Sequence, residues 1–174
     1  MGPPTPPKGH LIHDALTGVY SIEYFEHQVR SQVAYSLRHA RPLSLLVVAV
    51  DYLDELTQSF GAPARDAILG RVAERMKEDI REEDVLARYG AGEFAVLCVD
   101  TPQQAASFLA TRIRQSVESA GLAHAGMELP VTISLGVATL EPSDEEHHAM
   151  VASAEGALTR ARVTGNCVVV AGEE

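Results

Sequence analysis

Apolar residues recur at intervals of three or four positions in several segments of the chain, which is the spacing of an amphipathic helix. The first of these segments runs from Ser21 to about Ala40, and the Ser21 hydroxyl suits the capping position of a helix. Further helices are predicted at residues 52–60, 63–80, 102–120 and 147–163. In the helix predicted at 102–120, the apolar face is expected to include Phe108 and Leu109.

Short apolar runs between the helices predict strands. These runs lie at residues 43–50, 85–89, 93–99, 131–139 and 166–171. The first is interrupted only by Ser44 and is expected to be buried. The fourth alternates, which predicts that Thr132 and Ser134 face outward. The second and third flank Gly90-Ala91-Gly92, a pattern typical of a hairpin.

Taken in order, these elements predict an α/β (α+β) fold in which one mixed, mainly antiparallel sheet is flanked by helices. We expect residues 13–174 to form a single domain. Residues 1–12 contain repeated prolines, which lack the backbone N–H that helices and sheets use. This segment is therefore predicted to be a linker or tail.

The composition is that of a globular protein, since 46% of the 174 residues are hydrophobic. The formal net charge is −10, from 14 basic and 24 acidic residues, and this acidic excess argues against binding to long nucleic acid. No apolar run approaches the roughly 20 residues of a membrane helix, so no membrane partner is expected. The two cysteines lie in apolar runs and are expected to be free thiols, which favours a cytoplasmic location.

Two short motifs stand close together in the middle of the chain. Arg81-Glu82-Glu83-Asp84 precedes Gly90-Ala91-Gly92-Glu93-Phe94, and five residues separate them. Asp14-Ala15-Leu16-Thr17-Gly18 lies near the start, and residues 131–138 and 157–165 carry two later motifs. In this order and spacing the five motifs resemble the GGDEF family, the diguanylate cyclases that make cyclic di-GMP. The resemblance covers about residues 13–170 and implies a fold similar to that of nucleotidyl cyclases.

The same resemblance implies that catalysis has been lost. The motif Gly90 to Phe94 is called the signature turn below. Family members hold two divalent cations with an Asp on the first strand and an acidic residue at the third position of this turn. These cations neutralise phosphate and activate the ribose hydroxyl that attacks GTP. The two positions match Ala49 and Gly92, which offer no oxygen ligand to Mg²⁺. We therefore expect no catalytic residue, no metal, no required cofactor and no enzyme activity.

Four residues are expected to be remnants of the former catalytic site. Asp66 matches a position that contacts guanine, Arg162 matches one that contacts the triphosphate, and Glu93 is the fourth residue of the signature turn. Asp51 shares a strand face with Ala49. We expect Asp51 to cap the following helix rather than to replace the missing carboxylate.

Arg81 and Asp84 match the product-binding, inhibitory site of the family. A guanidinium fork can donate two hydrogen bonds to guanine O6 and N7, and a carboxylate can accept from the opposite edge of the base. Counting from the signature turn places Arg112 at a further ligand-binding position, with Arg114 as its neighbouring candidate. Arg81 and Asp84 are both expected at the surface, where an i, i+3 ion pair of no functional meaning is the alternative.

Three hypotheses for the function follow. In the first, a catalytically inactive domain binds cyclic di-GMP through Arg81, Asp84 and Arg112 and signals to a protein partner in a bacterial pathway. In the second, the domain is a protein-interaction module that binds no nucleotide. The third, ranked last, is a weakly active diguanylate cyclase. Because family members bind an intercalated pair of ligand molecules, the first hypothesis leaves open a ligand-linked dimer.

Overall fold

The computed structural model describes residues 12–173, so the proline-rich segment predicted at 1–12 lies outside the described residues except for its last position. The helices in this range are α1 (Ile22–His39), α2 (Leu53–Phe60), α3 (Ala62–Asp79), α4 (Gln103–Ala120) and α5 (His148–Thr164). The strands are β1 (Leu43–Val50), β2 (Val85–Gly90), β3 (Glu93–Val99), β4 (Leu122–His124), β5 (Met127–Leu129), β6 (Ile133–Thr139) and β7 (Val168–Val170).

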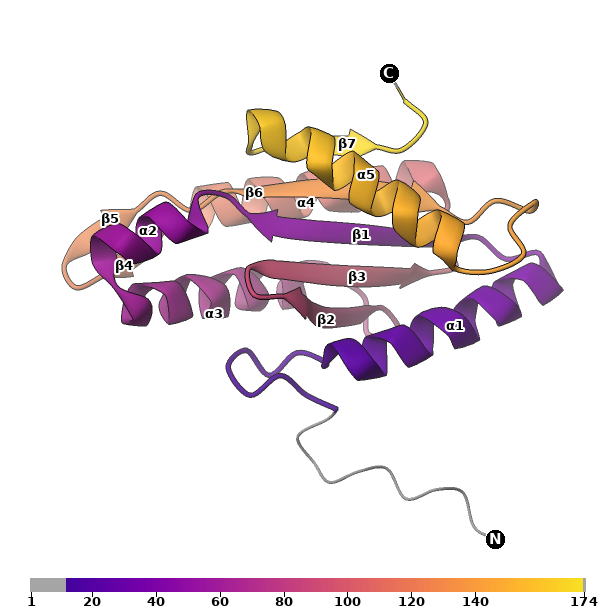
Figure 1. Ribbon diagram of the computed structural model, residues 1–174, viewed down its shortest axis with the longest axis horizontal. Helices are drawn as coiled ribbons and strands as arrows, with labels where there is room; N and C mark the ends of the chain where they lie inside the picture. The colour runs from indigo at the N-terminus through magenta and orange to yellow at the C-terminus, as the bar shows by residue number, and fades with distance from the viewer. Residues whose placement is uncertain (1–11, 174) are drawn as a thin grey trace, which may run out of the picture.

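One five-stranded sheet forms the centre of the molecule, with the strand order β2-β3-β1-β6-β7. β1 lies between β3 and β6 and is antiparallel to both, as Figure 1 shows. β2 is antiparallel to β3, and only β7 runs parallel to its neighbour β6. The predicted mixed, mainly antiparallel sheet flanked by helices is therefore confirmed.

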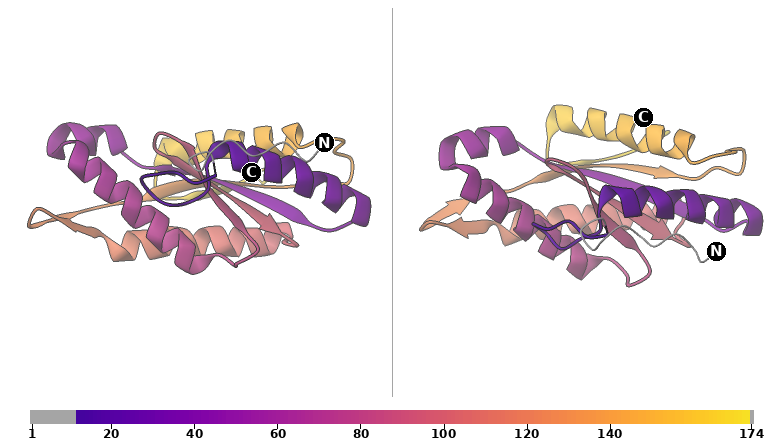
Figure 2. Two further views of the ribbon diagram at one scale, coloured as in Figure 1. Left: turned by 90° about the horizontal axis from the view of Figure 1, so that it is seen from below. Right: turned by 60° about the horizontal axis from the view of Figure 1, so that its bottom comes forward.

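Helices cover both faces of this sheet. Leu46 and Val48 of β1 pack in the hydrophobic cluster that includes α3 and α4. Leu45 and Val47, which alternate with them, pack in a second cluster with α1 and α5. Both views in Figure 2 place α1 and α5 on one side of the sheet and α3 and α4 on the other. Because β1 is buried on both faces, it has no solvent-facing positions, and its apolar run is interrupted only by the buried Ser44.

β6 differs from its prediction because the same two-sided covering applies to it. Ser134 was expected to face outward, yet its side chain is fully buried. The face of β6 that carries Ser134 lies under α5, which packs very closely at Gly136. A Cβ atom at Gly136 would lie 2.2 Å from the Ala154 carbonyl oxygen and 2.3 Å from the Leu158 nitrogen. Only glycine therefore permits this approach of helix to strand.

A small hairpin of β4 and β5 was not predicted from the sequence. Each strand has three residues, too few for an alternating pattern to be recognised. Ala125 and Gly126 connect them with φ angles of 51° and 78°, as a two-residue turn with positive φ requires. The hairpin lies outside the main sheet.

Two further expectations can be compared with the described residues. None of the helices between residues 12 and 173 combines the length and the apolar character that a membrane span requires. Cys98 and Cys167 are both free thiols, the first buried and the second partly exposed.

Candidate functional sites

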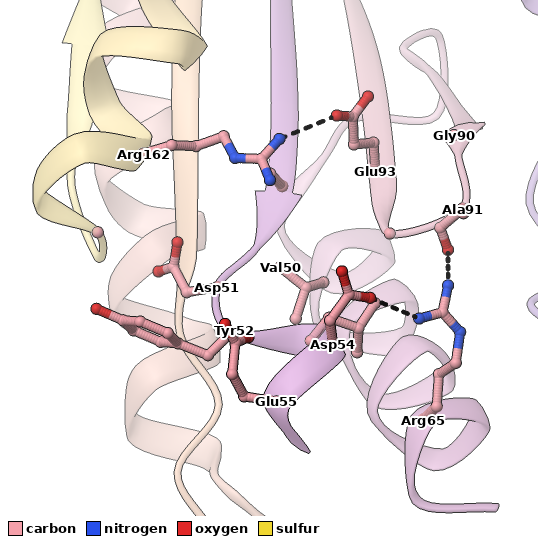
Figure 3. Close-up of a pocket in the computed structure, with 14 residues that line it drawn as sticks. Val50, Asp51, Tyr52, Asp54, Glu55, Arg65, Gly90, Ala91, Glu93 and Arg162 are labelled. Atoms are coloured by element: carbon pink, nitrogen blue, oxygen red, sulfur yellow. Dashed lines mark hydrogen bonds and ion pairs between the residues drawn. The ribbon is translucent and has the colours of Figure 1, made fainter. Parts of the chain in front are cut away.

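A hollow of about 480 Å³ opens where β1 ends, beside the turn that joins β2 to β3 (Figure 3). The end of β1, the start of α2, the turn and the C-terminal half of α5 supply its walls. Ala49 and Gly92 both line it, and Ala49 pairs with Glu93 across the sheet. The two positions that the family resemblance assigns to metal-binding carboxylates therefore line one shared hollow, and neither position carries a carboxylate.

Leu53 occupies the space next to Gly92. A Cβ atom at position 92 would lie 2.7 Å from Cδ2 of Leu53, which is too close for an unshifted side chain. The Leu53 side chain is itself buried in the core and is 6% exposed. An acidic residue at position 92 would therefore require Leu53 to move.

The acidic side chains in this hollow are not grouped as metal ligands. Glu93 faces Arg162, with 3.4 Å between Oε1 and Nη1 (Figure 3). Asp54 is 90% exposed and lies 3.8 Å from the Arg65 guanidinium. Among residues 12–173, no group of three or more His, Cys, Asp or Glu is arranged to hold a metal ion.

Two arginines fix the backbone of the signature turn. Arg65 donates to the Ala91 carbonyl at 3.0 Å, as drawn in Figure 3. Arg88 donates to the same carbonyl and to the Gly90 carbonyl, the latter at 2.9 Å. The turn is thus held in one conformation by side chains from α3 and β2.

Arg88 also connects the signature turn to the motif at residues 14–18, which is called the first motif below. Its Nη1 lies 3.3 Å from Oδ2 of Asp14. The same Asp14 oxygen accepts hydrogen bonds from the Thr17 backbone N–H at 3.0 Å and from the Thr17 hydroxyl at 2.7 Å. Partial burial raises the pKa of Asp14, but the Thr17 hydrogen bonds and the Arg88 charge outweigh it and hold that pKa below its usual value. The first motif is therefore structural: it closes the turn before α1 and orients Arg88.

Asp51 is not the helix cap that the sequence predicted. Its Oδ1 accepts a hydrogen bond from the Ser134 hydroxyl at 2.7 Å, and its Oδ2 accepts from the Thr132 hydroxyl and the Asn166 N–H, both at 2.8 Å. The N-cap position of α2 is Tyr52, which makes no side-chain capping bond. Buried Asp51 thus joins the end of β1 to the start of β6 and to the segment after α5, which explains why the hydroxyls of Ser134 and of Thr132, just before β6, point toward it.

The four residues that the family resemblance assigns to a lost catalytic site are only partly brought together. Asp51, Glu93 and Arg162 all line the hollow. Asp66 lies exposed on α3 and is not among the lining residues. The expected remnants therefore form an incomplete set around this space.

Asp84 lies between the end of α3 and the start of β2. The sequence predicted that it lies at the surface, but it is buried. Only 7% of the residue is exposed. Its Oδ2 accepts from the Arg81 N–H at 3.0 Å and its Oδ1 accepts from the Val99 N–H at 3.3 Å. Burial raises the pKa of Asp84, while these two backbone hydrogen bonds act in the opposite direction. Asp84 therefore has a structural role, whatever else it binds.

Arg81 differs sharply from Asp84. Its side chain is exposed, and among residues 12–173 no side chain or carbonyl forms a hydrogen bond or an ion pair with its guanidinium. Arg81 and Asp84 line two adjacent hollows. One of about 470 Å³ lies toward the first motif, and one of about 180 Å³ lies toward α4. The smaller one is called the α4 hollow below.

Arg112 lies on the wall of the α4 hollow, as the count from the signature turn predicted. Its Nη2 donates to the Asp79 carbonyl oxygen at 2.6 Å, and its Nε lies 3.5 Å from the Asp79 carboxylate. The guanidinium thereby caps the end of α3 and remains largely exposed. Arg114, the neighbouring candidate, instead contacts Glu118 and Asn166. Arg81, Asp84 and Arg112 therefore share one hollow and Arg114 does not.

Two other residues of the α4 hollow were not identified from the sequence. Asp79 lines it, and its Oδ2 is the buried side-chain oxygen within residues 12–173 that has no hydrogen-bond partner. Phe108 lines it as well, with 68% of the residue exposed. Phe108 was predicted to lie on the apolar face of α4, and helical spacing gives no means of separating it from its partly buried neighbour Leu109.

Comparison with solved structures identifies the fold. The crystal structure of the GGDEF domain of DgcB from Caulobacter crescentus, in complex with c-di-GMP, matches with a TM-score of 0.91 and 21% identity over 99% of both chains. Diguanylate cyclase SiaD from Pseudomonas aeruginosa, in complex with its activator SiaC, matches with a TM-score of 0.87 and 28% identity over 92% of this chain and 62% of that one.

Comparison of sequences agrees with the fold. The response regulator PleD of Caulobacter vibrioides is 30% identical over 161 residues, which are 91% of this chain and 36% of PleD. The chain spans less than half the length of the first curated relatives that it matches. The family model described as "Diguanylate cyclase, GGDEF domain" matches residues 11–167. The chain therefore belongs to the family of GGDEF domains.

Proposed function

We propose that this domain is a catalytically inactive receptor that binds cyclic di-GMP through Arg81, Asp84 and Arg112 and passes the signal to a protein partner. The observation that carries the proposal is the exposed side chain of Arg81, which forms no hydrogen bond or ion pair within residues 12–173 and shares a hollow with Asp84 and Arg112. A simple surface ion pair would engage the Arg81 side chain with the Asp84 carboxylate. Instead, that carboxylate is held by backbone N–H groups.

The Asp84 carboxylate retains acceptor capacity for a ligand. Each of its oxygens has two lone pairs and accepts one backbone hydrogen bond. One lone pair on each oxygen is thus left for the N1–H and N2–H₂ groups of guanine, while Arg81 can donate to O6 and N7. Adenine presents a different set of donors and acceptors, so this pair of side chains favours guanine. Arg112 supplies a second guanidinium, which suits a phosphate.

The proposed lack of catalysis rests on Ala49 and Gly92. Joining two GTP molecules requires cations that neutralise phosphate charge, and oxygen ligands must hold those cations. Neither residue offers one, Leu53 fills the space beside Gly92, and the Glu93 carboxylate faces Arg162. Neither a metal nor another cofactor is part of the proposal.

The relatives support the class of ligand and of partner. The GGDEF domain of DgcB was crystallised in complex with c-di-GMP, and SiaD was crystallised in complex with a protein activator. A cytoplasmic location suits such a receptor and agrees with two free thiols, which persist in reducing compartments.

Two measurements on nucleotide-free protein test the proposal. Incubation with GTP and Mg²⁺ or Mn²⁺ should yield no cyclic di-GMP by chromatography, and repeated turnover would contradict the proposed inactivity. Titration with cyclic di-GMP should give saturable binding, whereas cyclic di-AMP should bind at least tenfold more weakly. Absence of binding to both would overturn the receptor and leave the protein-interaction module as the function.

A further inference from the structure

Phe108 is an aromatic residue that the packing of α4 does not explain. The buried face of this helix consists of Ala106, Ala110, Ile113 and Val117. Phe108 lies off that face, and its exposed fraction of 68% is large for a phenyl side chain. Exposed apolar residues are common on proteins when they stand alone. Phe108 does not stand alone, since it lies beside the cluster of charged groups in the α4 hollow.

The surroundings of Phe108 match the chemistry of a nucleotide base. Phe108 lines the same hollow as Arg81 and Asp84. Arg112 follows Phe108 by four residues and therefore lies on the same side of the helix. A base has a flat apolar face and a hydrogen-bonding edge. The hollow thus combines a ring for the face with an arginine and a carboxylate for the edge.

The size of the hollow indicates which part of a ligand it holds. Its volume of about 180 Å³ is below the roughly 300–1,000 Å³ of sites that enclose a drug-sized molecule. A complete cyclic dinucleotide would not fit inside. One base can enter while the ribose and phosphate groups remain at the surface near Arg81 and Arg112.

We propose that Phe108 is a stacking platform for one guanine of the bound cyclic dinucleotide, an inference that rests on the proposed function. Stacking of a base on an aromatic side chain tolerates any base, because every base has a π-face. Phe108 therefore adds affinity and the Arg81–Asp84 pair adds selectivity for guanine. Removing the ring should weaken binding about tenfold to hundredfold. The stability of the fold should not change, since the side chain is exposed.

Substitution by tryptophan gives a direct test, because the chain contains no Trp. Phe108→Trp introduces a single indole whose fluorescence should be quenched when guanine stacks on it. Tyr35→Trp is the matched control, since Tyr35 is 53% exposed and lies on α1, outside the hollow. Calorimetric titration with cyclic di-GMP of the wild type, Phe108→Ala and both Trp variants gives the affinities independently.

The expected result is weakened binding by Phe108→Ala, retained binding by Phe108→Trp with saturable quenching, and no quenching of Tyr35→Trp. If the wild type binds and Phe108→Ala binds equally well, the stacking role is wrong while the receptor stands. Binding to Phe108→Trp without a change of its fluorescence would also overturn the stacking role. If the wild type does not bind, the receptor and the stacking role both fail.

Discussion

Replacing Asp84 by alanine should destabilise the fold, whereas replacing Arg81 should not. The two residues belong to one proposed binding motif, yet only Asp84 is buried and hydrogen-bonded to the backbone. The Asp84→Ala variant leaves the Arg81 and Val99 N–H groups without an acceptor. The Arg81→Ala variant removes an exposed side chain that forms no hydrogen bond or ion pair within residues 12–173.

The magnitude follows from the two lost hydrogen bonds. A buried donor left without an acceptor costs about 1–3 kcal/mol. The Arg81 N–H lies in a surface segment and can recover a bond to water, so the sum should be about 2–4 kcal/mol. For a domain of 150–250 residues, each kcal/mol lowers the melting temperature by roughly 2–4 °C. Asp84→Ala should therefore lower it by roughly 5–15 °C, and Arg81→Ala should change stability by less than about 0.5 kcal/mol.

The pH dependence provides a second observable for the same residue. Burial raises the pKa of Asp84 in the folded state above the unfolded value of 3.8. The folded state therefore holds this proton more tightly than the unfolded chain does. The contribution of Asp84 to stability is most favourable below pH 3.8 and declines as the pH rises through the folded pKa. Relative to Asp84→Asn, which does not titrate, the wild type should gain stability on acidification.

Thermal and urea unfolding followed by circular dichroism would measure these differences on the wild type, Arg81→Ala, Asp84→Ala and Asp84→Asn. Asp84→Asn keeps one acceptor oxygen and should fall between the wild type and Asp84→Ala. If Asp84→Ala unfolds at the same urea concentration as the wild type, the structural role assigned to this carboxylate is wrong. Equal destabilisation by Arg81→Ala would contradict the distinction between the two residues.

Three other substitutions address the rest of the molecule. Gly92→Asp should not create turnover of GTP, because the new Cβ would lie 2.7 Å from Leu53 Cδ2 and position 49 would still lack a carboxylate. Formation of cyclic di-GMP from GTP by this variant would disprove the prediction. Asp51→Ala removes the acceptor of three hydrogen bonds and should lower the unfolding free energy by about 2–4 kcal/mol. If this variant unfolds at the same urea concentration as the wild type, the structural role of Asp51 is wrong. Gly136→Ala should lower the unfolding free energy by at least about 1–3 kcal/mol through overpacking against α5. A melting temperature equal to that of the wild type in calorimetry would refute this.

Much of the fold was predictable because its elements carry strong periodic patterns. The helices at 22–39 and 103–120 and the strand at 93–99 were placed within one residue of their observed bounds. What could not be predicted was the covering of both sheet faces near α5. Alternation along β6 suggested an outward Ser134, but that side chain donates a hydrogen bond to buried Asp51. Sequence distance conceals this contact, since 83 positions separate the two residues.

The candidate binding site was also predictable only in part. Motif spacing predicted that Arg81, Asp84 and Arg112 belong together, and all three line the α4 hollow. The sequence did not predict the burial of Asp84, because an i, i+3 charge pair is normally a surface feature. Nor did it predict the exposure of Phe108. Helical spacing places Phe108 and Leu109 almost equally near the core, and only the tertiary packing of α4 separates them.

Calorimetric titration of the wild type and of Arg81→Ala with cyclic di-GMP tests the central claim most directly. Arg81→Ala preserves the fold, so a change in affinity reports binding rather than stability. Arg81→Lys is the matched control, since it keeps the charge but loses the planar fork. Saturable binding by the wild type, weakened roughly tenfold to hundredfold in Arg81→Ala and nearly as much in Arg81→Lys, is the predicted result. No binding by the wild type, or equal binding by Arg81→Ala, would contradict a cyclic di-GMP receptor built on Arg81.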